Sequence, residues 1–584
     1  MKTVLTVAAL LALTMTACRD DTSTTDAGQP LPFLSDPLRA DAGCDWAQWG
    51  QNWAHTGQAC VPGQGFGRVL GTVTFDPFVP QEVEEAGGLF GRDDLFAHYA
   101  SPLIVGDDLY MAVKSGVYVS CSPPGTLGNP APCGFDAWDQ QSWTVKHLAW
   151  ESGTLTPKQS FPSSWKPPPW RVVAGWEPVF QPAIHDQVVW VPGAEGTVIR
   201  LDRQLGTTQA VNPFGDSNPN RYITGPLVID ADGTLLYNVI ELDALMPQSA
   251  DARGYLVRVP TSGAPTKVLY QSIVAGAPAA SDQCPYSFSA AHISGPYPAT
   301  VPVPTGPCGS QRPGFNSGPA IGPGGVVFVV SRAHFAQNDS SLVALNPDLT
   351  PRWTFRMREF LDDGCGVLAT GCRQGAPVGV DPSTGLKPSV WVNDEASSVP
   401  VALPDGAVLY GGLTAYNGSR GHLVKVGPDG RLMGTYDFGW DVTPAVWVHG
   451  GTYSIITKDN HYYAANGGEG PYDITQLSRD LTPQWKFTST QTQSCQTETD
   501  GGMTCVSDHP DGFEWCVNAP AVGPDGTVYA NSEDGRVYSI RQGGSQGEQR
   551  FLLQSLGAAY TPIAIDSKGR VYSMNGGLLT VVGQ

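Results

Sequence analysis

One short pattern recurs along the chain and constrains its fold more than any other feature. Each copy has a small or polar residue, a proline and two apolar residues, followed by a turn that usually carries glycine and by a second apolar stretch. The eight prolines are Pro102, Pro182, Pro226, Pro319, Pro400, Pro444, Pro520 and Pro562. Proline lacks an N–H group and fits the start of a strand, and Asp-Gly pairs such as Asp232-Gly233 supply the positive φ that tight hairpins need. Eight equivalent β units in 584 residues indicate one repeat architecture and not several unrelated domains.

The spacing of these prolines indicates the size of one unit. Pro182 and Pro226 are 44 residues apart, which fits one four-stranded blade, and the longer intervals fit a blade with an insertion. A ninth blade near residues 272–315 is an open alternative. Only 22 residues follow Pro562, so a strand at 67–75 should complete the last blade. The sequence therefore predicts an all-β, eight-bladed β-propeller of four-stranded antiparallel blades, closed by pairing of its N- and C-terminal strands.

The first eighteen residues are typical of an export signal. Lys2 precedes an apolar stretch at 3–13 that is too short to span a bilayer, and the sequence Met15-Thr16-Ala17-Cys18 follows. This ending resembles a bacterial lipobox, which implies lipidation at Cys18 and an anchor in the outer membrane. Cleavage after Ala17, as in an ordinary signal peptide, is the alternative. Residues 19–42 are poor in apolar side chains and are expected to form a flexible tether before the propeller at 43–584.

Eleven further cysteines fall mostly into close sequential pairs inside the long intervals. Insertions are expected near 118–140, 273–315, 358–395 and 488–516. The candidate disulfides are Cys44/Cys60, Cys121/Cys133, Cys284/Cys308 and Cys365/Cys372, with Cys495, Cys505 and Cys516 as a trio of which one stays free. Such local pairs are typical of an oxidising compartment. No pair has the C-x₂₋₄-C spacing of a metal site, so no metal is predicted.

The net charge restricts the class of partner. A formal charge of -20 disfavours nucleic acid and anionic lipid surfaces, which repel an acidic protein at long range. An envelope protein, peptide or glycan is the expected partner, with membrane contact through the lipid anchor only.

Two motifs carry a resemblance to a known family. The segment from Asp45 to Gly57 has the spacing W-x-x-W-G-x-x-x-x-x-x-G. Residues 342–355 and 477–487 resemble the signature A-L-D-x-x-T-G-x-x-x-W, with proline in place of the glycine. Both motifs resemble those of PQQ-like, quinoprotein-type propellers. The tryptophans Trp353 and Trp485 are expected to pack between adjacent blades.

Candidate binding residues precede the anchor prolines, because the chain segments that enter the innermost strands meet at one mouth of the central channel. His98, Tyr99 and Tyr560 belong to this ring. The ligand-binding candidates are Trp176, Glu177, Arg221, Tyr222, Asn316, Asp394, Glu395, Trp440, Asp441, Glu514 and Trp515. An aromatic and acidic ring of this kind could hold a cationic peptide, a sugar or a metal-bound cofactor. The alternative is that the aromatic residues fill the mouth and the carboxylates are only solvated.

The family resemblance implies a second function. Quinoprotein dehydrogenases hold PQQ over calcium with carboxylates and an asparagine, and Glu177, Arg221, Asn316 and Asp394 are of the required types. The chain has neither a Cys-Cys dipeptide nor a Cys-x-x-Cys-His haem motif. The sequence therefore favours a non-catalytic, membrane-anchored binding or scaffold module without a cofactor and without catalytic residues. A PQQ- and calcium-dependent alcohol or sugar dehydrogenase is the alternative.

Overall fold

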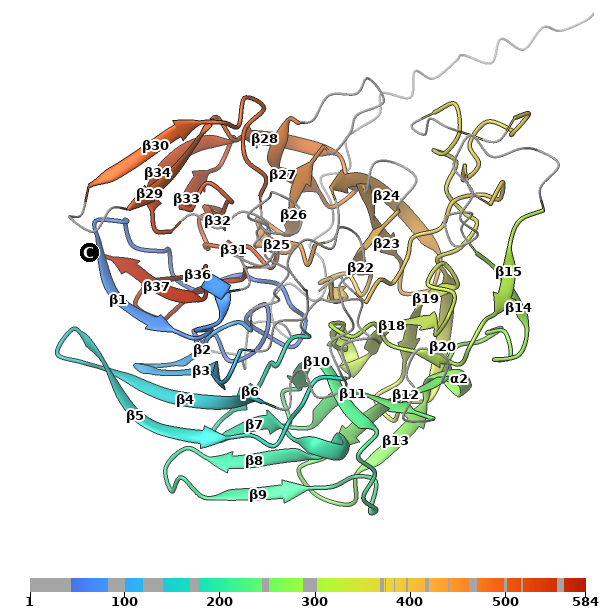
Figure 1. Cartoon of the computed structure of the whole chain (residues 1–584), viewed down its shortest axis with the longest axis horizontal. Coiled ribbons are helices and arrows are strands. Elements are labelled where there is room, and N and C mark those ends of the chain that lie inside the picture. Colours follow the sequence, from blue (N-terminus) through green and yellow to red (C-terminus); the bar gives the residue numbers. More distant parts are fainter. Residues whose placement is uncertain are drawn as a thin grey trace, which may run out of the picture.

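The computed structural model describes residues 44–81, 100–118, 140–168, 178–243, 251–286, 302–367, 372, 374–382, 384–394, 398–414, 420–439, 442–461, 470–497, 502–515, 518–553 and 561–584. Eight β-sheets surround a central axis, each with its innermost strand toward the centre (Figure 1). The predicted eight-bladed propeller of four-stranded antiparallel blades is confirmed. Within these ranges, no helix has the length and apolar character needed to cross a membrane.

The blades follow one another in chain order, each from its innermost to its outermost strand. Blade 1 is β2 (Leu103–Val105), β3 (Asp108–Gly116), β4 (Gln141–Glu151) and β5 (Thr154–Pro162); blade 2 is β6 (Ala183–His185), β7 (Val188–Pro192), β8 (Val198–Asp202) and β9 (Thr208–Val211). Blade 3 is β10 (Arg221–Ile229), β11 (Leu235–Leu242), β12 (Ala252–Val259) and β13 (Thr266–Leu269); blade 4 is β17 (Ala320–Ile321), β18 (Val327–Ala333), β19 (Ser340–Leu345) and β20 (Pro351–Arg356), with β16 (Gln311–Arg312) also on β18. Blade 5 is β21 (Val401–Ala402), β22 (Val408–Leu413), β23 (Arg420–Val426) and β24 (Leu432–Gly439); blade 6 is β25 (Ala445–His449), β26 (Thr452–Asn460), β27 (Tyr472–Ser478) and β28 (Pro483–Thr488). Blade 7 is β31 (Ala521–Val522), β32 (Val528–Asn531), β33 (Arg536–Arg541) and β34 (Ser545–Phe551); blade 8 is β35 (Ile563–Ile565), β36 (Val571–Asn575), β37 (Leu578–Gly583) and β1 (Arg68–Thr74).

Seven of the eight anchor prolines directly precede an innermost strand, as the repeat predicts. The exception is Pro226, which lies inside β10 where the register with β11 shifts between Thr224 and Val228. We call the side on which the innermost strands begin the mouth face. The opposite side, where each innermost strand turns into the second strand, is the turn face. Asp-Gly turns at the turn face have the expected positive φ, for example 79° at Gly233 and 81° at Gly406.

The ring is closed by its two terminal strands. β1 pairs antiparallel with β37, with Thr72 opposite Thr580 and Val73 opposite Leu579. The strand predicted at 67–75 thus supplies the outermost strand of blade 8, and the ring has no unpaired end blade. The second strands pack against neighbouring blades on both faces, and all residues of β11 and of β18 are buried.

The longest interval between anchor prolines holds an insertion instead of a ninth blade. Its described residues form the one-turn helix α2 (Tyr270–Ile273) and the hairpin of β14 (Gln283–Pro285) and β15 (Thr305–Pro307). A second inserted hairpin, of β29 (Gln493–Thr497) and β30 (Met503–Ser507), precedes blade 7.

Four of the expected disulfides are present. They join Cys44 to Cys60, Cys284 to Cys308, Cys365 to Cys372 and Cys495 to Cys505. The last pair lies directly across the β29–β30 hairpin. Cys18, Cys121, Cys133 and Cys516 lie outside the described residues.

Residues 44–60, joined end to end by the Cys44–Cys60 disulfide, run along the inside of the ring; we call this segment the belt. Its backbone or side chains hydrogen-bond to the innermost strands of seven blades in chain order, from blade 1 to blade 7. The inner-strand partners are Ile104, Ile184, Ile229, Ile321, Ala402, Val446 and Val522. In blades 1 and 2, for example, the amides of Ile104 and Ile184 donate to the carbonyls of Trp46 and Ala47, both at 2.8 Å.

The belt explains the spacing of the tryptophan–glycine motif. Trp46 and Trp49 are each only 1% exposed, so they serve as packing residues. Gly57 has φ +63°, and a Cβ there would lie 2.6 Å from the carbonyl oxygen of Pro520. Gly50 has φ +60°, and a Cβ there would lie 2.9 Å from the Cα of His55. Both glycines are therefore required by close backbone approach.

The tryptophans of the second motif pack between blades, as predicted. The Trp353 indole N–H donates to the carbonyl of Pro428 in blade 5 at 3.0 Å. The Trp485 indole N–H reaches the Gln542 amide oxygen in blade 7 at 3.5 Å. In both cases the outermost strand of one blade contacts the turn between the third and fourth strands of the next.

Candidate functional site

Polar residues that immediately precede the innermost strands link neighbouring blades. The amide of Ser101 donates to the Gln181 side-chain oxygen at 2.6 Å, which joins blades 1 and 2. In the same way, the amide of Thr443 donates to the Asn518 side-chain oxygen at 2.6 Å between blades 6 and 7. All four residues are buried. The start of each innermost strand therefore uses its polar groups to hold the ring together.

Asp394, one of the predicted ligand-binding residues, is the centre of a buried ion cluster. Arg312 donates to both of its carboxylate oxygens, at 2.7 and 2.6 Å, and Arg332 donates to one of them at 3.0 Å. Burial alone would raise the pKa of Asp394, but the two guanidinium groups outweigh it and hold that pKa below its ordinary value. The carboxylate is thus ionised, and both of its oxygens accept from protein donors.

A neutral histidine completes this cluster. Arg312 Nε donates to His334 Nδ1 at 2.8 Å, which requires the unprotonated nitrogen there. Burial, followed by the charges of Arg312 and Arg332, lowers the pKa of His334 to about 3. Two cations, one carboxylate and a neutral imidazole leave the cluster with one net positive charge at pH 7.

Asn316, also a predicted ligand-binding residue, does lie beside Asp394. Its side-chain oxygen accepts from the amide of Val179 at 2.8 Å, and its side-chain amide donates to the backbone carbonyl of Asp394 at 3.1 Å. Asn316 is 1% exposed. It therefore ties together the segments that enter blades 2 and 5.

Arg221 and Tyr222 lie at the start of β10, away from this cluster. Arg221 pairs with Glu241 at 2.5 Å and with Asp216, and its guanidinium lies 4.3 Å from the centre of the Phe214 ring. Tyr222 is half-buried against the small core of blade 3. The charge of Arg221 is balanced within its own blade.

Trp515 is a core residue. It is fully buried, its indole N–H donates to the carbonyl of Tyr472 at 3.0 Å, and its ring meets Tyr538 edge-on at 5.2 Å. The neighbouring Glu514 is half-buried, and its carbonyl accepts from the amide of Glu533. Outside the described residues lie His98, Tyr99, Trp176, Glu177, Glu395, Trp440, Asp441 and Tyr560.

Of the four residues that the quinoprotein resemblance assigns to PQQ and calcium, the structure describes Arg221, Asn316 and Asp394. These three do not fit that role. Asp394 has both oxygens bonded to arginine, and Asn316 uses both side-chain groups on the backbone. Arg221 is paired with Asp216 and Glu241. Each side chain already has a structural partner, so no step of a quinone mechanism can be derived from them.

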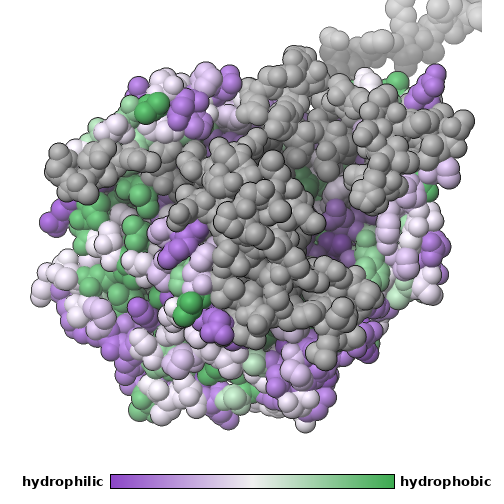
Figure 2. Space-filling view, in the orientation of Figure 1, coloured by the Kyte–Doolittle hydropathy of each residue, from purple (hydrophilic) through white to green (hydrophobic). Residues whose placement is uncertain are grey.

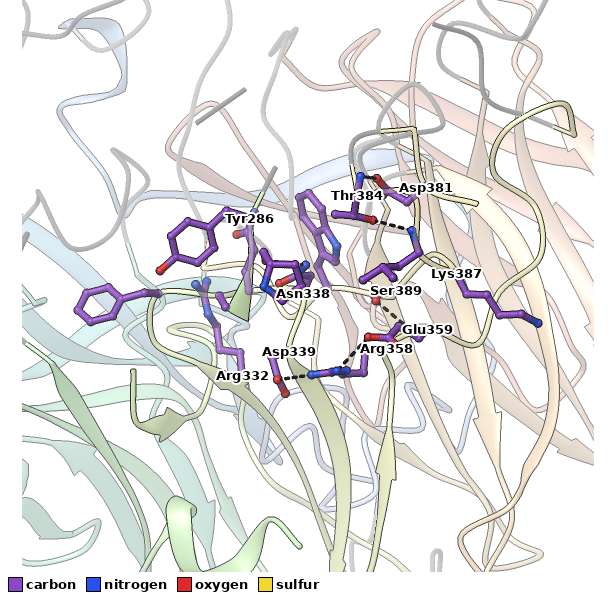
Figure 3. A pocket seen from close by; sticks show the side chains of 16 residues that line it. Tyr286, Arg332, Asn338, Asp339, Arg358, Glu359, Asp381, Thr384, Lys387 and Ser389 are labelled. Atoms are coloured by element: carbon purple, nitrogen blue, oxygen red, sulfur yellow. Dashed lines mark hydrogen bonds and ion pairs between the residues drawn. The ribbon is translucent and has the colours of Figure 1, made fainter. Parts of the chain in front are cut away.

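A pocket of ≈ 360 Å³ lies on the mouth face beside blade 4. Its walls come from the β14–β15 insertion, the connection between β18 and β19, and the insertion before blade 5. Figure 3 shows Tyr286 on one side, Asn338 and Asp339 in the middle, and Thr384 and Lys387 on the other side. Arg332 belongs both to this wall and to the Asp394 cluster.

Ion pairs hold the floor of the pocket. Arg358 contacts Asp339 at 2.7 Å and Glu359 at 2.9 Å, and Arg356 contacts Asp339 from the other side at 2.7 Å. Asp339 is only 3% exposed, whereas the side chains of Arg356 and Arg358 are 29% and 32% exposed, so the pairs join a buried carboxylate to partly solvated guanidinium groups. Elsewhere on the visible rim of this face, purple hydrophilic residues alternate with smaller green patches (Figure 2).

Sequence reasoning placed insertions at this pocket but did not name its lining residues. They come from segments near residues 285, 335 and 385, which are far apart in the chain. The available signal was that two cysteine-bearing insertions flank the same blade, with disulfides Cys284–Cys308 and Cys365–Cys372.

One further group of side chains has the types of a metal site. Asp459, His461 and Asp473 place one ligand atom each within 4.8 Å of one another at the ends of β26 and β27. Lys486 Nζ lies 2.7 Å from Asp459 and 3.3 Å from Asp473. Burial would lower the pKa of Lys486, but these carboxylates outweigh it and raise it. The Lys486 ammonium group already compensates the charge of the two carboxylates, as a bound metal ion would. We therefore interpret the group as an ion-pair network.

Known proteins resemble this chain in fold only. No protein-family model and no curated protein matches the sequence. Among solved structures, BamB from Moraxella catarrhalis is similar with 13% identity and a TM-score of 0.36, over 83% of this chain and 96% of BamB. Quinohemoprotein alcohol dehydrogenase ADHIIG from Pseudomonas putida is similar with 11% identity and a TM-score of 0.46, over 93% and 76% of the two chains. The corresponding enzyme from Comamonas testosteroni has 12% identity and a TM-score of 0.46, over 95% and 84%. Similarity at this level assigns no function.

Proposed function

We propose that this chain is an exported, lipid-anchored β-propeller that acts as a binding or scaffold module for a protein, peptide or glycan at the cell envelope. The observation that carries this proposal is the pocket on the mouth face, where two disulfide-bearing insertions added to a regular ring form its walls together with the β18–β19 connection. Binding residues commonly lie on such connections, held in place by a rigid scaffold.

The disulfides support export. Four are present in the described residues, and disulfides persist mainly in oxidising compartments outside the cytoplasm. Anchoring depends on Cys18. We expect Cys18→Ala to move the protein from the membrane fraction to the soluble fraction and to remove labelling by radioactive palmitate, while the folded propeller is retained.

Partner contact is expected at the mouth face. A photoreactive amino acid at Leu386, which is 40% exposed on the pocket rim, should form crosslinks in intact cells. The matched control is Leu205, which is 74% exposed in the β8–β9 turn on the turn face. Equal crosslinking at both positions, or none at Leu386, would contradict the proposal.

No cofactor is part of the proposal. PQQ and Ca²⁺ added to the purified protein, with an artificial electron acceptor and a panel of alcohols and sugars, should give neither a bound quinone spectrum nor turnover. Turnover that depends on both PQQ and Ca²⁺ would contradict the proposed binding module and support a quinoprotein dehydrogenase instead.

A further inference from the structure

The pocket beside blade 4 is built as a rigid, preformed site. Tyr286 follows the disulfide residue Cys284, and Gln337 to Asp339 lie in the short connection between β18 and β19. Arg358 and Asp339 fix the floor through their ion pair at 2.7 Å. A site held this way loses little conformational freedom when a ligand binds.

Several polar groups of the pocket wall have no partner among the residues that the structure describes. Among the described residues, none hydrogen-bonds to the Gln337 side chain or to the Trp391 indole N–H, although many other polar groups of the wall are paired. Asn338 donates to the Pro285 carbonyl at 3.3 Å, and its side-chain oxygen is unused. Glu359, whose side chain is 40% exposed, binds Arg358 through Oε1, and no described residue donates to its Oε2. The wall thus offers both donors and acceptors.

Charge in the pocket is balanced. The side chains that line it include three cations and three carboxylates: Arg332, Arg358 and Lys387 against Asp339, Glu359 and Asp381. The pocket therefore does not select strongly for a charged ligand, although the whole chain carries a charge of -20. Tyr286 and Trp391 add aromatic rings to the lining of the pocket.

These properties suit a neutral polyhydroxylated molecule. Each sugar hydroxyl both donates and accepts, which matches the mixed groups of Gln337, Asn338, Glu359 and Trp391, and the C–H face of a sugar ring packs on an aromatic ring. The volume of ≈ 360 Å³ is at the lower end of the range of about 300–1,000 Å³ for ligand sites, which fits one or two sugar rings.

An extended peptide fits less well. Peptides commonly bind by adding a strand to a free sheet edge. The strands that flank the pocket connection, β18 and β19, are both paired on their two sides, with β16 or β17, with each other and with β20. We propose that this pocket binds a neutral saccharide unit of one or two rings; this inference rests on the binding function proposed above.

Titration calorimetry and ligand-observed NMR with cellobiose, maltose and N,N′-diacetylchitobiose test the inference on the purified mature protein. We expect saturable binding of at least one of them. Trp391→Phe keeps the aromatic face but removes the N–H, and Glu359→Gln removes the charged acceptor; each should weaken binding about three- to tenfold. Trp447→Phe is the matched control, since Trp447 is a half-buried tryptophan whose N–H donates to the Pro524 carbonyl outside the pocket, and it should leave binding unchanged.

Unchanged thermal midpoints would show that the variants fold. Saccharide binding that is insensitive to Trp391→Phe and Glu359→Gln would overturn the inference. So would binding of tri-alanine or tri-glutamate peptides in place of saccharides, although Leu386 crosslinks would still support the wider binding function. Absence of the Leu386 crosslinks together with absence of all ligand binding would contradict both the saccharide inference and the wider binding function.

Discussion

The two faces of the propeller use polar residues in different ways. At the turn face and inside the ring, Asp-Gly turns and the belt satisfy backbone groups through regular contacts that repeat from blade to blade. At the mouth face, insertions bring together an irregular set of charges, in which the Asp394 cluster supports the wall of a pocket. Each region also contains one buried, neutral histidine: His55 in the belt and His334 in the cluster. Repetition specifies the ring, whereas the non-repeated segments carry the site.

The largest effect is expected from breaking the mouth-face cluster. Asp394→Ala leaves Arg312 and Arg332 buried without a counter-charge, which should lower the free energy of unfolding by about 3–5 kcal/mol. Urea denaturation measures this. Asp362→Ala is the control, because its pair with Lys387 is exposed and should contribute about 0–1 kcal/mol. Similar losses in both variants would show that the cluster is not buried as described.

Opening the belt should have the next largest effect. The Cys44–Cys60 disulfide closes a separation of 16 residues, so the double variant Cys44→Ser/Cys60→Ser should lose about 3 kcal/mol. Cys365→Ser/Cys372→Ser opens a separation of only 7 residues and should lose less. The difference between the two thermal midpoints, measured under non-reducing conditions, compares the two regions directly. A smaller loss for the belt variant would refute the ranking.

Mild acid should lower the free energy of unfolding through the buried histidines of both regions. Burial, opposed by the bond to Pro400, lowers the pKa of His55 to about 4, and that of His334 is about 3, against 6.5 in the unfolded chain. The unfolded state therefore binds more protons below pH 6.5, so stability is full above that pH and is lost as pH falls toward the folded values. The expected slope is up to about 1.4 kcal/mol per pH unit for each histidine.

Variants separate the two contributions. His334→Gln keeps an acceptor for Arg312, and His55→Asn tolerates the positive φ of 61°. Each should reduce the slope of unfolding free energy between pH 6.5 and 4.5. A slope as steep as that of the unsubstituted protein in either variant would mean that folding does not lower the pKa of the histidine that was replaced.

Much of the ring could be predicted from sequence, because its rules act locally. Seven of the eight anchor prolines directly precede an innermost strand, and the shortage of residues after Pro562 required the strand now seen as β1. The disulfides between cysteines that are close in sequence were also predictable, because short loops keep such cysteines near each other.

The site was predicted less well because residue type does not reveal pairing. Asp394 and Asn316 have the chemistry of ligand residues, yet their groups are used by Arg312, Arg332 and the backbone. Trp515, another predicted ligand-binding residue, is buried between blades 6 and 7. Gln337 and Trp391 carry no motif, and only the folded chain brings them to the same pocket.

The belt has a consequence for biosynthesis. It is the first described segment to leave the ribosome, but its partners extend to Val522, and β1 pairs with β37 at residues 578–583. The native contacts of this early segment are therefore completed only after nearly the whole chain has been translated and translocated. A chain truncated before blade 7 would present the belt without its last partner, and β1 as an open strand edge.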